Sequence, residues 1–350
     1  MTRIYLIRHA EAEGNLYRVA HGWHNGLITN DRGYRQIDAL RRRFQEVDID
    51  AVYASDLYRT QLTARAIWLP KALPLHLEPA FREIHMGVWE DRTWHELNVQ
   101  YPEEMYHFNR RVDLFRVEGG ETAQDVLDRY LPALHRVAAA HDGGTVAVFS
   151  HGAALRIVLG TLQGVPLSDI GDTPHGDNTA VSLLTWDNGA LRVEYRDDNS
   201  HLTAEGLSTF ARQSWWRSAK MVESGEDYAP LPPQLRPRFQ VPDGGEAVGI
   251  RKDEAFIGAF QLLPDDEPDA GRLGWYWLDP AWRGKGLGVA PMGQVLSHFR
   301  RQGVRFLRLS CGDRDLRRFF ARLGFYPLDG DTMEKDIRVA LPPIPQEYRP

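Results

Sequence analysis

The sequence predicts an α/β protein in two parts, a three-layer α/β/α domain followed by a smaller α+β domain. Roughly the first 200 residues alternate short apolar runs, typical of buried parallel strands, with segments whose apolar residues recur at helical spacing. A cluster of five prolines then falls between residues 223 and 243, which indicates a domain boundary. Beyond it, strand-like segments follow one another directly before the next helix, as in an α+β arrangement.

The first part opens with an apolar strand over residues 4–7. A helix is predicted over residues 31–47, where Ile37, Leu40 and Phe44 share one face. The last two strands of this part are joined by an Asp-Asn-Gly hairpin turn signal. The further strands are expected at residues 51–53, 75–77, 145–149, 181–186 and 191–195, and the further helices at residues 56–68, 123–141 and 153–162.

The second part is preceded by a predicted helix and a connector. Residues 203–222 have helical spacing, with Thr203 as a candidate N-cap and Glu205 in the first turn. The proline-rich residues 223–243 are expected to form a semi-rigid connector. The second part then comprises three strands from Glu246 onward, a helix over residues 288–302, a strand over residues 306–310 and a helix over residues 315–323.

The composition indicates a globular protein with neither a nucleic-acid nor a membrane partner. At 350 residues the chain is long enough for two domains, and 43% hydrophobic and 26% charged residues are ordinary proportions for a soluble protein. The formal net charge of −6 argues against nucleic acid, and no apolar run approaches the ~20 residues of a membrane span. The single cysteine, Cys311, excludes an internal disulfide framework and a cysteine-based zinc site. Because the chain starts in a strand rather than in a signal-peptide pattern, we expect a cytoplasmic protein.

Two histidines stand where apolar strands of the first part end. His9 follows the strand at residues 4–7, and His151 follows the strand at residues 145–149. Ligands of open α/β sheets bind at the carboxyl ends of the parallel strands, so both rings are expected at one site. Arg8, beside the first histidine, offers a fixed positive fork suited to a phosphate. These positions predict a histidine nucleophile in an arginine-lined anion pocket.

An ordered set of motifs supports this hypothesis. The motifs are Arg8-His9-Ala10-Glu11, Asn15, Gly22, Leu27-Ile28-Thr29, Ser55-Asp56-Leu57-Tyr58-Arg59-Thr60, Glu83 and Ser150-His151-Gly152. The set resembles the histidine phosphatase superfamily, which includes the cofactor-dependent phosphoglycerate mutases, and it covers roughly the first 200 residues. Ala10 stands where the family usually has Gly, a small change.

The resemblance implies a catalytic role for five residues. His9 attacks phosphorus as a neutral ring, while Arg8, Arg59 and His151 balance the charge on the transferring oxygens. Glu83 is the candidate general acid, which protonates the leaving oxygen and then, as a carboxylate, activates water. No metal and no cofactor are expected for this reaction.

The resemblance also suggests substrate-binding residues, with plainer alternatives. Asn15, Gly22 and Thr29 match phosphate-site positions, although Asn15 is also suited to closing a turn and Thr29 to capping one. His21, His24, His85 and His175 are interpreted as polar loop histidines rather than catalysts.

Within the superfamily we predict a phosphatase acting on a small-molecule phosphomonoester. The segment between Glu83 and His151 is shorter than the insertion that shields phosphohistidine in mutases, and residues 86–90 resemble the phosphatase branch. Mutase-type phosphoryl transfer is the alternative. We expect the lid that contacts the substrate to lie in residues 89–115, a stretch that is also compatible with ordinary packing. Its candidate lid residues are Trp94, Tyr106, Arg110 and Arg111.

The second part contains a glycine-rich turn, Arg283-Gly284-Lys285-Gly286-Leu287-Gly288, between a strand and a helix. Backbone N–H groups of such a turn can cradle a pyrophosphate. With residues 319–325, this turn resembles the GNAT acetyltransferase family, which implies acetyl-CoA or another acyl-CoA as cofactor and a small-molecule amine as acceptor. The implied cofactor-binding residues are Leu278, Arg283, Gly284, Lys285, Gly286, Leu287 and Gly288.

Two departures from the GNAT pattern leave the role of this part open. Phe320 occupies the position of the tyrosine that often protonates the CoA thiolate, and Asp313 replaces a common asparagine. The alternatives are an N-acyltransferase, a CoA-binding domain, and a regulatory or dimerisation module. The domains are therefore predicted as residues 1–205 (histidine phosphatase), 206–243 (helical and Pro-rich connector) and 244–345 (GNAT-like, acyl-CoA-binding), and no oligomeric state is predicted.

Overall fold

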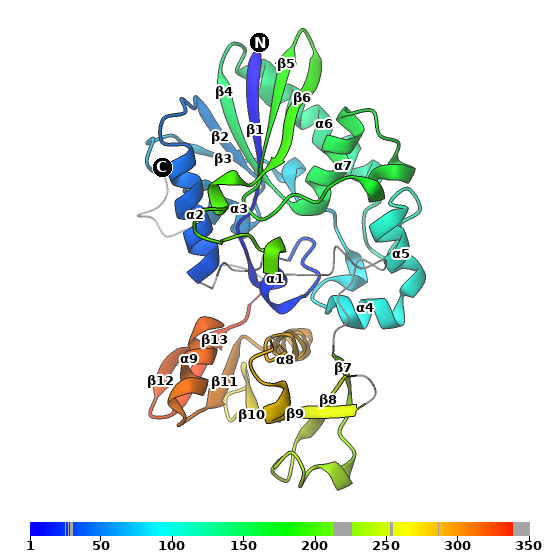
Figure 1. Cartoon of the computed structure of the whole chain (residues 1–350), viewed down its shortest axis with the longest axis vertical. Coiled ribbons are helices and arrows are strands. Elements are labelled where there is room, and N and C mark those ends of the chain that lie inside the picture. Colours follow the sequence, from blue (N-terminus) through cyan, green and yellow to red (C-terminus); the bar gives the residue numbers. More distant parts are fainter. Residues whose placement is uncertain are drawn as a thin grey trace.

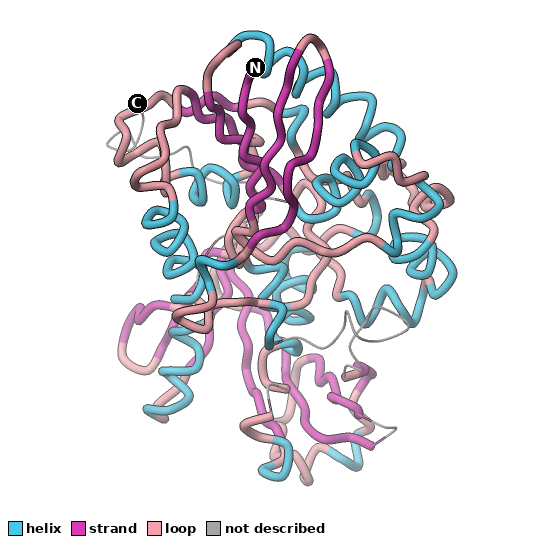
Figure 2. Tube along the Cα trace, turned by 45° about the horizontal axis from the view of Figure 1, so that its top comes forward, coloured by secondary structure: helices cyan, strands magenta, loops and turns pink. Residues whose placement is uncertain are grey.

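A computed structural model of the chain describes residues 1–24, 26, 28, 31–212, 226–252, 255–285 and 287–338. Two bodies, each built around its own β-sheet, lie one above the other in Figure 1. Figure 2 shows helices flanking the strands of the upper, N-terminal body. Within the described residues, no helix combines the length and the apolarity needed to cross a membrane.

The sheet of the first body has six strands in the order β3-β2-β4-β1-β5-β6. Strands β1 and β4 are parallel, with Arg8 opposite Ser150, so His9 and His151 leave the sheet at the same edge. Strand β5 runs antiparallel to β1, so its first residues also lie at that edge. The strands are β1 (Thr2–Arg8), β2 (Ala51–Ala54), β3 (Leu75–Leu77), β4 (Thr145–Ser150), β5 (Val181–Asp187) and β6 (Ala190–Asp198).

Helices cover both faces of this sheet, which confirms the three-layer prediction. On one face, α6 and α7 pack against Ile4 and Val148, and on the other, α2 and α3 pack against Tyr5 and Ala147. Helices α4 and α5 lie in the stretch considered for the lid and were not predicted as helices. The helices are α1 (Glu13–Tyr17), α2 (Asp31–Arg43), α3 (Tyr58–Ala64), α4 (Trp94–Gln100), α5 (Pro102–Arg110), α6 (Ala123–Ala140) and α7 (Gly152–Leu162).

The second body is a seven-stranded sheet in the order β12-β13-β11-β10-β9-β8-β7, with two helices in its described part. The four predicted strands and both predicted helices are present, whereas β7, β12 and β13 were not predicted. The elements are β7 (Asp227–Pro230), β8 (Glu246–Lys252), β9 (Ala255–Pro264), β10 (Ala270–Leu278), α8 (Ala290–Arg301), β11 (Phe306–Ser310), α9 (Arg314–Arg322), β12 (Tyr326–Asp329) and β13 (Thr332–Asp336).

The stretch predicted as a connector differs from the prediction where it is described. Residues 227–230 form the edge strand β7, paired with β8, and Phe239 and Val241 are buried against Ala247. Proline is tolerated there because an edge strand leaves one row of N–H groups without a ladder partner. Residues 226–243 thus belong to the second body.

The helix predicted from Thr203 does not begin there. Gly206 has φ +59°, and the chain turns so that Leu207 packs on Leu202 and Ala39. A short 3-10 turn follows at Phe210–Arg212. Residues 213–222 of this predicted helix lie outside the described residues.

Candidate functional site

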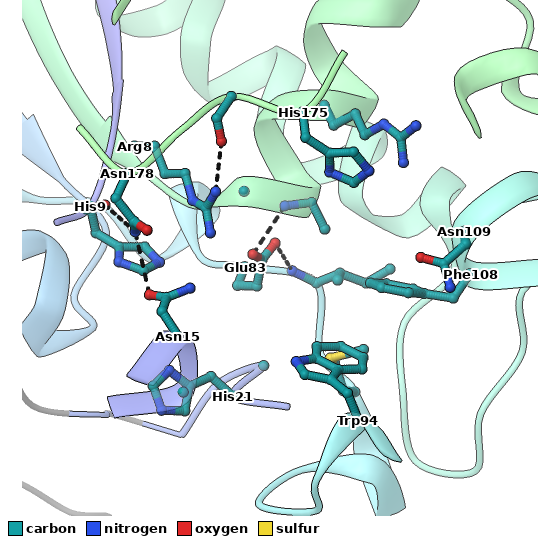
Figure 3. A pocket seen from close by; sticks show the side chains of 18 of the residues that line it. Arg8, His9, Asn15, His21, Glu83, Trp94, Phe108, Asn109, His175 and Asn178 are labelled. Atoms are coloured by element: carbon teal, nitrogen blue, oxygen red, sulfur yellow. Dashed lines mark hydrogen bonds between the residues drawn. The ribbon is translucent and has the colours of Figure 1, made fainter. Parts of the chain in front are cut away.

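A cavity of about 170 Å³ lies at the carboxyl edge of the first sheet. Its walls come from the loop after β1, the start of α7, helices α4 and α5, and the segments before β5 and after β6. Figure 3 shows His9 and Arg8 on one side of the cavity and Trp94 and Phe108 on the other. The predicted residues Arg8, His9, Arg59 and Glu83 all line it.

His9 is a buried ring held in one orientation. Its main-chain N–H donates to the Ser150 carbonyl at 3.0 Å, which fixes the residue to the end of β4. Its Nδ1 lies 2.7 Å from the carbonyl oxygen of Ala10. Since a carbonyl oxygen can only accept, Nδ1 carries the hydrogen, and Nε2 keeps its lone pair.

The charges around His9 keep the ring neutral. Burial, then Arg59 and Arg8, hold the pKa of His9 well below its usual value. A neutral imidazole with a lone pair on Nε2 is the state that a nucleophile needs.

His151 is held by Arg59 and Ser55. The Nε of Arg59 donates to Nδ1 of His151 at 3.1 Å, so the hydrogen of the ring is on Nε2, which lies 2.7 Å from the Ser55 hydroxyl oxygen. Burial, then Arg59 and His9, hold the pKa of His151 well below its usual value. The two histidine rings are 5.4 Å apart between centroids, so His151 lies next to His9, but His151 is not one of the residues that line the cavity.

Arg59 supplies a buried positive charge from the first turn of α3. Its other two nitrogens donate to the carbonyls of His24, at 2.5 Å, and Gly22, at 2.7 Å. Burial lowers the pKa of Arg59 to about 10, so the guanidinium stays charged at neutral pH. The resemblance placed Gly22 in the phosphate site, and this glycine lines the cavity while its carbonyl anchors the arginine.

Arg8 lies across the start of α7. One of its terminal nitrogens donates to the Gly176 carbonyl at 2.6 Å, while its Nε is buried without a hydrogen-bond partner among the described residues. A Cβ on Gly152 would come within 3.1 Å of the guanidinium, so a glycine at this position leaves room for it. A buried guanidinium N–H that lacks a partner suits an anionic ligand.

Glu83 is fixed by the first amides of α7. One carboxylate oxygen accepts from the N–H groups of Ile84 at 3.0 Å and Ala154 at 2.8 Å, and the other accepts from Ala153 at 3.1 Å. A helix N-terminus favours negative charge, which explains why a carboxylate is held at this wall of the cavity. In Figure 3, Glu83 lies between His9 and Trp94.

Asn15 both closes a turn and lines the cavity. Its Oδ1 accepts from the Ala12 N–H at 3.1 Å and from the Asn178 side chain at 3.3 Å. Asn178 also donates to the His9 carbonyl at 3.0 Å and thereby ties the segment before β5 to the histidine loop. The third candidate binding residue, Thr29, lies outside the described residues.

Sequence reasoning missed several lining residues. His21 and His175, interpreted as loop histidines, line the cavity, and burial holds the pKa of each well below its usual value. Asn178 and Phe210 line it as well. His175 and Asn178 reach the site because β5 runs antiparallel to β1, so its start lies at the same edge as the ends of the parallel strands; no local sequence pattern shows this direction.

The lid stretch contributes an apolar wall. Trp94 lines the cavity and stacks on Phe108 with 5.5 Å between ring centroids. The other three candidates do not line it: Tyr106 is 58% exposed, Arg110 pairs with Asp172, and Arg111 pairs with Asp113. The apolar lining residues in this region are Ile84, Met86, Trp94, Met105, Phe108 and Val112.

In the second body, β10 and β11 separate before the glycine-rich turn. Their parallel pairing ends at Leu273 opposite Leu309, while β10 continues to Leu278 and, among the described residues, pairs there only with β9. The register of β10 shifts next to Gly274, where the two strands diverge. One edge of the later half of β10 is therefore open, in the sense that no strand of the described part of the chain pairs with it.

The glycine-rich turn leads from this open edge to α8. The Nε of Arg283 donates to the Leu278 carbonyl at 2.7 Å, and the Tyr276 hydroxyl donates to the Gly288 carbonyl at 2.5 Å. Gly284, Lys285 and Leu287 belong to this turn, whereas Gly286 lies outside the described residues. The N-cap residue of α8, Val289, makes no side-chain hydrogen bond to the helix. Phe320 is buried, with its ring 6.2 Å from that of Tyr276.

Comparison with known proteins gives two family matches along the chain. Residues 4–199 match the model of the histidine phosphatase superfamily (branch 1), and residues 210–325 match that of the acetyltransferase (GNAT) family. These matches agree with both resemblances inferred from the motifs.

Individual relatives match the first body. Phosphoserine phosphatase 1 of Hydrogenobacter thermophilus is 33% identical over 171 residues, which are 48% of this chain and 79% of the relative. The probable phosphoglycerate mutase GpmB of Erwinia tasmaniensis is 29% identical over 217 residues, 61% of this chain and 100% of the relative. Among solved structures, Bacillus stearothermophilus YhfR has a TM-score of 0.56 and 30% identity, with 58% of this chain and 100% of that chain covered.

Proposed function

The chain belongs to the histidine phosphatase superfamily through residues 4–199, and we propose that it hydrolyses small-molecule phosphomonoesters through a phosphohistidine on Nε2 of His9. The observation that carries the proposal is the contact of His9 Nδ1 with the Ala10 carbonyl, which leaves Nε2 as the nucleophilic atom. Arg8 and Arg59 line the same cavity and supply the positive charge that a phosphoryl group requires.

In the proposed first step, Nε2 of His9 forms a bond to phosphorus as the bond from phosphorus to the ester oxygen breaks. The leaving oxygen takes the proton of the Glu83 carboxyl group and departs as an alcohol. Arg8 and Arg59 stabilise the three remaining phosphoryl oxygens, whose charge grows in the transition state, while His151 holds Arg59 in place by accepting its Nε–H.

In the second step, water attacks the phosphorus of phosphohistidine. The Glu83 carboxylate takes a proton from this water, the bond from nitrogen to phosphorus breaks, and phosphate leaves. Both enzyme groups return to their starting states, so one ester and one water give one alcohol and one phosphate.

The apolar wall bears on the organic part of the substrate. Figure 3 shows Trp94 and Phe108 on the side of the cavity away from Arg8 and His9, and Met105 also lines the cavity. A substrate with an aromatic or aliphatic group next to its phosphate therefore suits the site best. In mutase-type phosphoryl transfer, the alternative, the acceptor of the phosphoryl group from phosphohistidine is a phosphorylated acid rather than water.

The test is a product analysis with the full chain. Phenyl phosphate, phosphoserine and 3-phosphoglycerate are each incubated with the protein, and released phosphate and phosphate migration are both measured. We expect phosphate release, fastest from phenyl phosphate. Migration of phosphate within 3-phosphoglycerate without release would favour the mutase alternative.

For the second body, we infer that the open edge of β10 and the turn at residues 283–288 bind acetyl-CoA or another acyl-CoA. The open strand edge offers main-chain groups to an extended amide chain, and the N-terminus of α8, without a side-chain cap, suits a pyrophosphate. A bound acyl-CoA would supply an activated acyl group for transfer to a small-molecule amine. Because Phe320 has no proton to donate, we propose binding rather than rapid transfer, and a purely regulatory or dimerisation role is the rival.

The binding proposal is tested by thermal unfolding of the full chain with acetyl-CoA. Ligand linkage predicts a higher unfolding midpoint for the wild type. Lys285→Glu places a negative charge in the turn and should weaken the shift, while Arg318→Glu, on the exposed side of α9, is the matched control. No shift with the wild type at millimolar acetyl-CoA would leave only the regulatory or dimerisation role.

A further inference from the structure

The second body packs directly against the loop that carries His9. Helix α8 lies next to α1 (Figure 1), and Tyr17 of α1 is buried within the apolar core of the second body. The Tyr17 hydroxyl donates to the Leu323 carbonyl at 2.8 Å. A Cβ on Gly293 would stand 2.7 Å from the Tyr17 carbonyl oxygen, so a glycine in α8 permits this close approach.

A buried cluster of charges holds the two bodies together. Glu13, the first residue of α1, is 2% exposed, and its two carboxylate oxygens each lie 2.8 Å from a cation of the second body, one from Arg300 and the other from Lys335. Burial alone would raise the pKa of Glu13, but Lys335 and Arg300 lower it to about 2. The carboxylate is therefore charged at neutral pH and depends on both partners.

Arg300 also contacts the segment that enters the lid. Its second terminal nitrogen donates to Asp91 at 3.0 Å, and its Nε donates to the Ile337 carbonyl at 2.6 Å. Two residues after Asp91, Thr93 caps α4 and accepts a hydrogen bond from Gln294 of α8 at 2.7 Å. One guanidinium thus joins the start of α1 to the residues that precede the lid helix.

The two segments that contain Glu13 and Asp91 also contribute residues that line the cavity. Asn15 is two residues after Glu13, and Trp94 is three residues after Asp91. A movement of either segment would change where these side chains lie relative to His9. An arginine that holds both segments can therefore set their separation.

We propose that Arg300 and Lys335 are positioning residues of the phosphatase site, acting through Glu13 and Asp91 on the histidine loop and the lid. The second body then completes the first body's site rather than merely accompanying it. This inference rests on the proposed phosphatase function and adds that the reaction needs the second body in place.

The test compares two arginines of the second body with similar surroundings. Arg300→Met removes the link to Glu13 and Asp91. Arg308→Met is the matched control, because Arg308 is also largely buried and pairs with three carboxylates, of Asp265, Glu267 and Glu334, all within the second body. Full-length proteins are assayed with p-nitrophenyl phosphate.

For Arg300→Met we expect kcat/KM to fall at least about tenfold, mainly through kcat, since a shift of about 1 Å in a catalytic constellation can cost about a hundredfold. Arg308→Met should stay within about twofold of the wild type. If Arg300→Met fails to fold, Arg300→Lys keeps the charge but not the fork, and an intermediate loss in kcat is expected. Equal activity of the Arg300 and Arg308 variants would overturn the proposal.

A double-mutant cycle tests whether Lys335 acts through Glu13. Lys335→Met should lower kcat in the wild type but have little further effect in Glu13→Gln, because the partner carboxylate is already gone. Additive losses would mean that Lys335 acts by another route.

Amide hydrogen exchange tests the inference independently of activity. In Arg300→Met, residues 10–20 and 91–100 should exchange faster than in the wild type and in Arg308→Met. If the wild type proves inactive towards all phosphomonoesters, the phosphatase proposal fails. The positioning role is then decided by comparing the affinity of the wild type and of Arg300→Met for inorganic phosphate, together with this exchange pattern. Unchanged exchange at both segments would overturn it.

Discussion

Replacing Glu83 with glutamine separates its proposed chemical role from its structural one. Three main-chain N–H groups donate to the carboxylate, two to one oxygen and one, from Ala153, to the other. A glutamine keeps one oxygen for two of these donors but turns an NH₂ group towards the third. The variant loses one acceptor and the negative charge at the start of α7, which should cost about 1–3 kcal/mol of unfolding free energy.

The effect on turnover depends on the leaving group. General acid catalysis typically contributes about 10²–10⁴-fold, so hydrolysis of an alkyl phosphate by Glu83→Gln should fall by that factor, or about 3–5 kcal/mol in activation free energy. The p-nitrophenolate group leaves without a proton, so formation of phosphohistidine from p-nitrophenyl phosphate should be nearly spared. Hydrolysis of the phosphohistidine still needs Glu83 as a base, so this second step becomes rate-limiting in the variant.

The assay is rapid mixing of p-nitrophenyl phosphate with the full chain. Glu83→Gln should release a burst of nitrophenolate close to one equivalent per site, followed by slow turnover, and burst kinetics report an accumulating covalent intermediate. A uniform loss of activity across alkyl and aryl esters, with no burst, would refute both proposed roles of Glu83.

Three further outcomes follow from named contacts. Tyr17→Phe removes the hydrogen bond to Leu323 and should lower the free energy of unfolding by about 1–2 kcal/mol in denaturant titrations; an unchanged value would mean that the carbonyl finds another donor. Burial holds the pKa of His9 and of His151 well below the usual value, so below about pH 6.5 the unfolded chain binds more protons than the native state. The unfolding midpoint should therefore fall as the pH is lowered from 7 to 5, whereas a flat profile would contradict neutral, buried rings. Trp94→Ala should raise KM for phenyl phosphate more than for methyl phosphate, and equal changes would exclude Trp94 from the apolar wall.

The part of the site that rests on parallel strands could be predicted from the sequence. Apolar runs before His9 and His151 indicate adjacent buried strands, and the shared edge of such strands brings the two rings within 5.4 Å. Glu83 was identified through the family resemblance alone, because no local pattern shows that its loop meets the first turn of α7. The antiparallel direction of β5, which brings Asn178 to the site, depends on sheet pairing across the chain.

The errors in the fold have a common cause in long-range packing. The proline-rich stretch has the composition of a connector, yet Phe239 and Val241 are buried against strands that follow in the sequence. Similarly, Glu13 has no local feature that distinguishes it from a surface glutamate. Its burial depends on Arg300 and Lys335, almost the whole chain away, and only the folded arrangement shows that pairing.

The most direct test of the phosphatase account is the site of phosphorylation during turnover. Full-length protein is mixed with p-nitrophenyl phosphate, quenched with base, because phosphohistidine is labile to acid, and digested for mass spectrometry. The account predicts one phosphate on the peptide that contains His9, absent from His9→Ala, which should remain folded but release no phosphate. Turnover by His9→Ala at the wild-type rate, or phosphate trapped on a different residue, would contradict it.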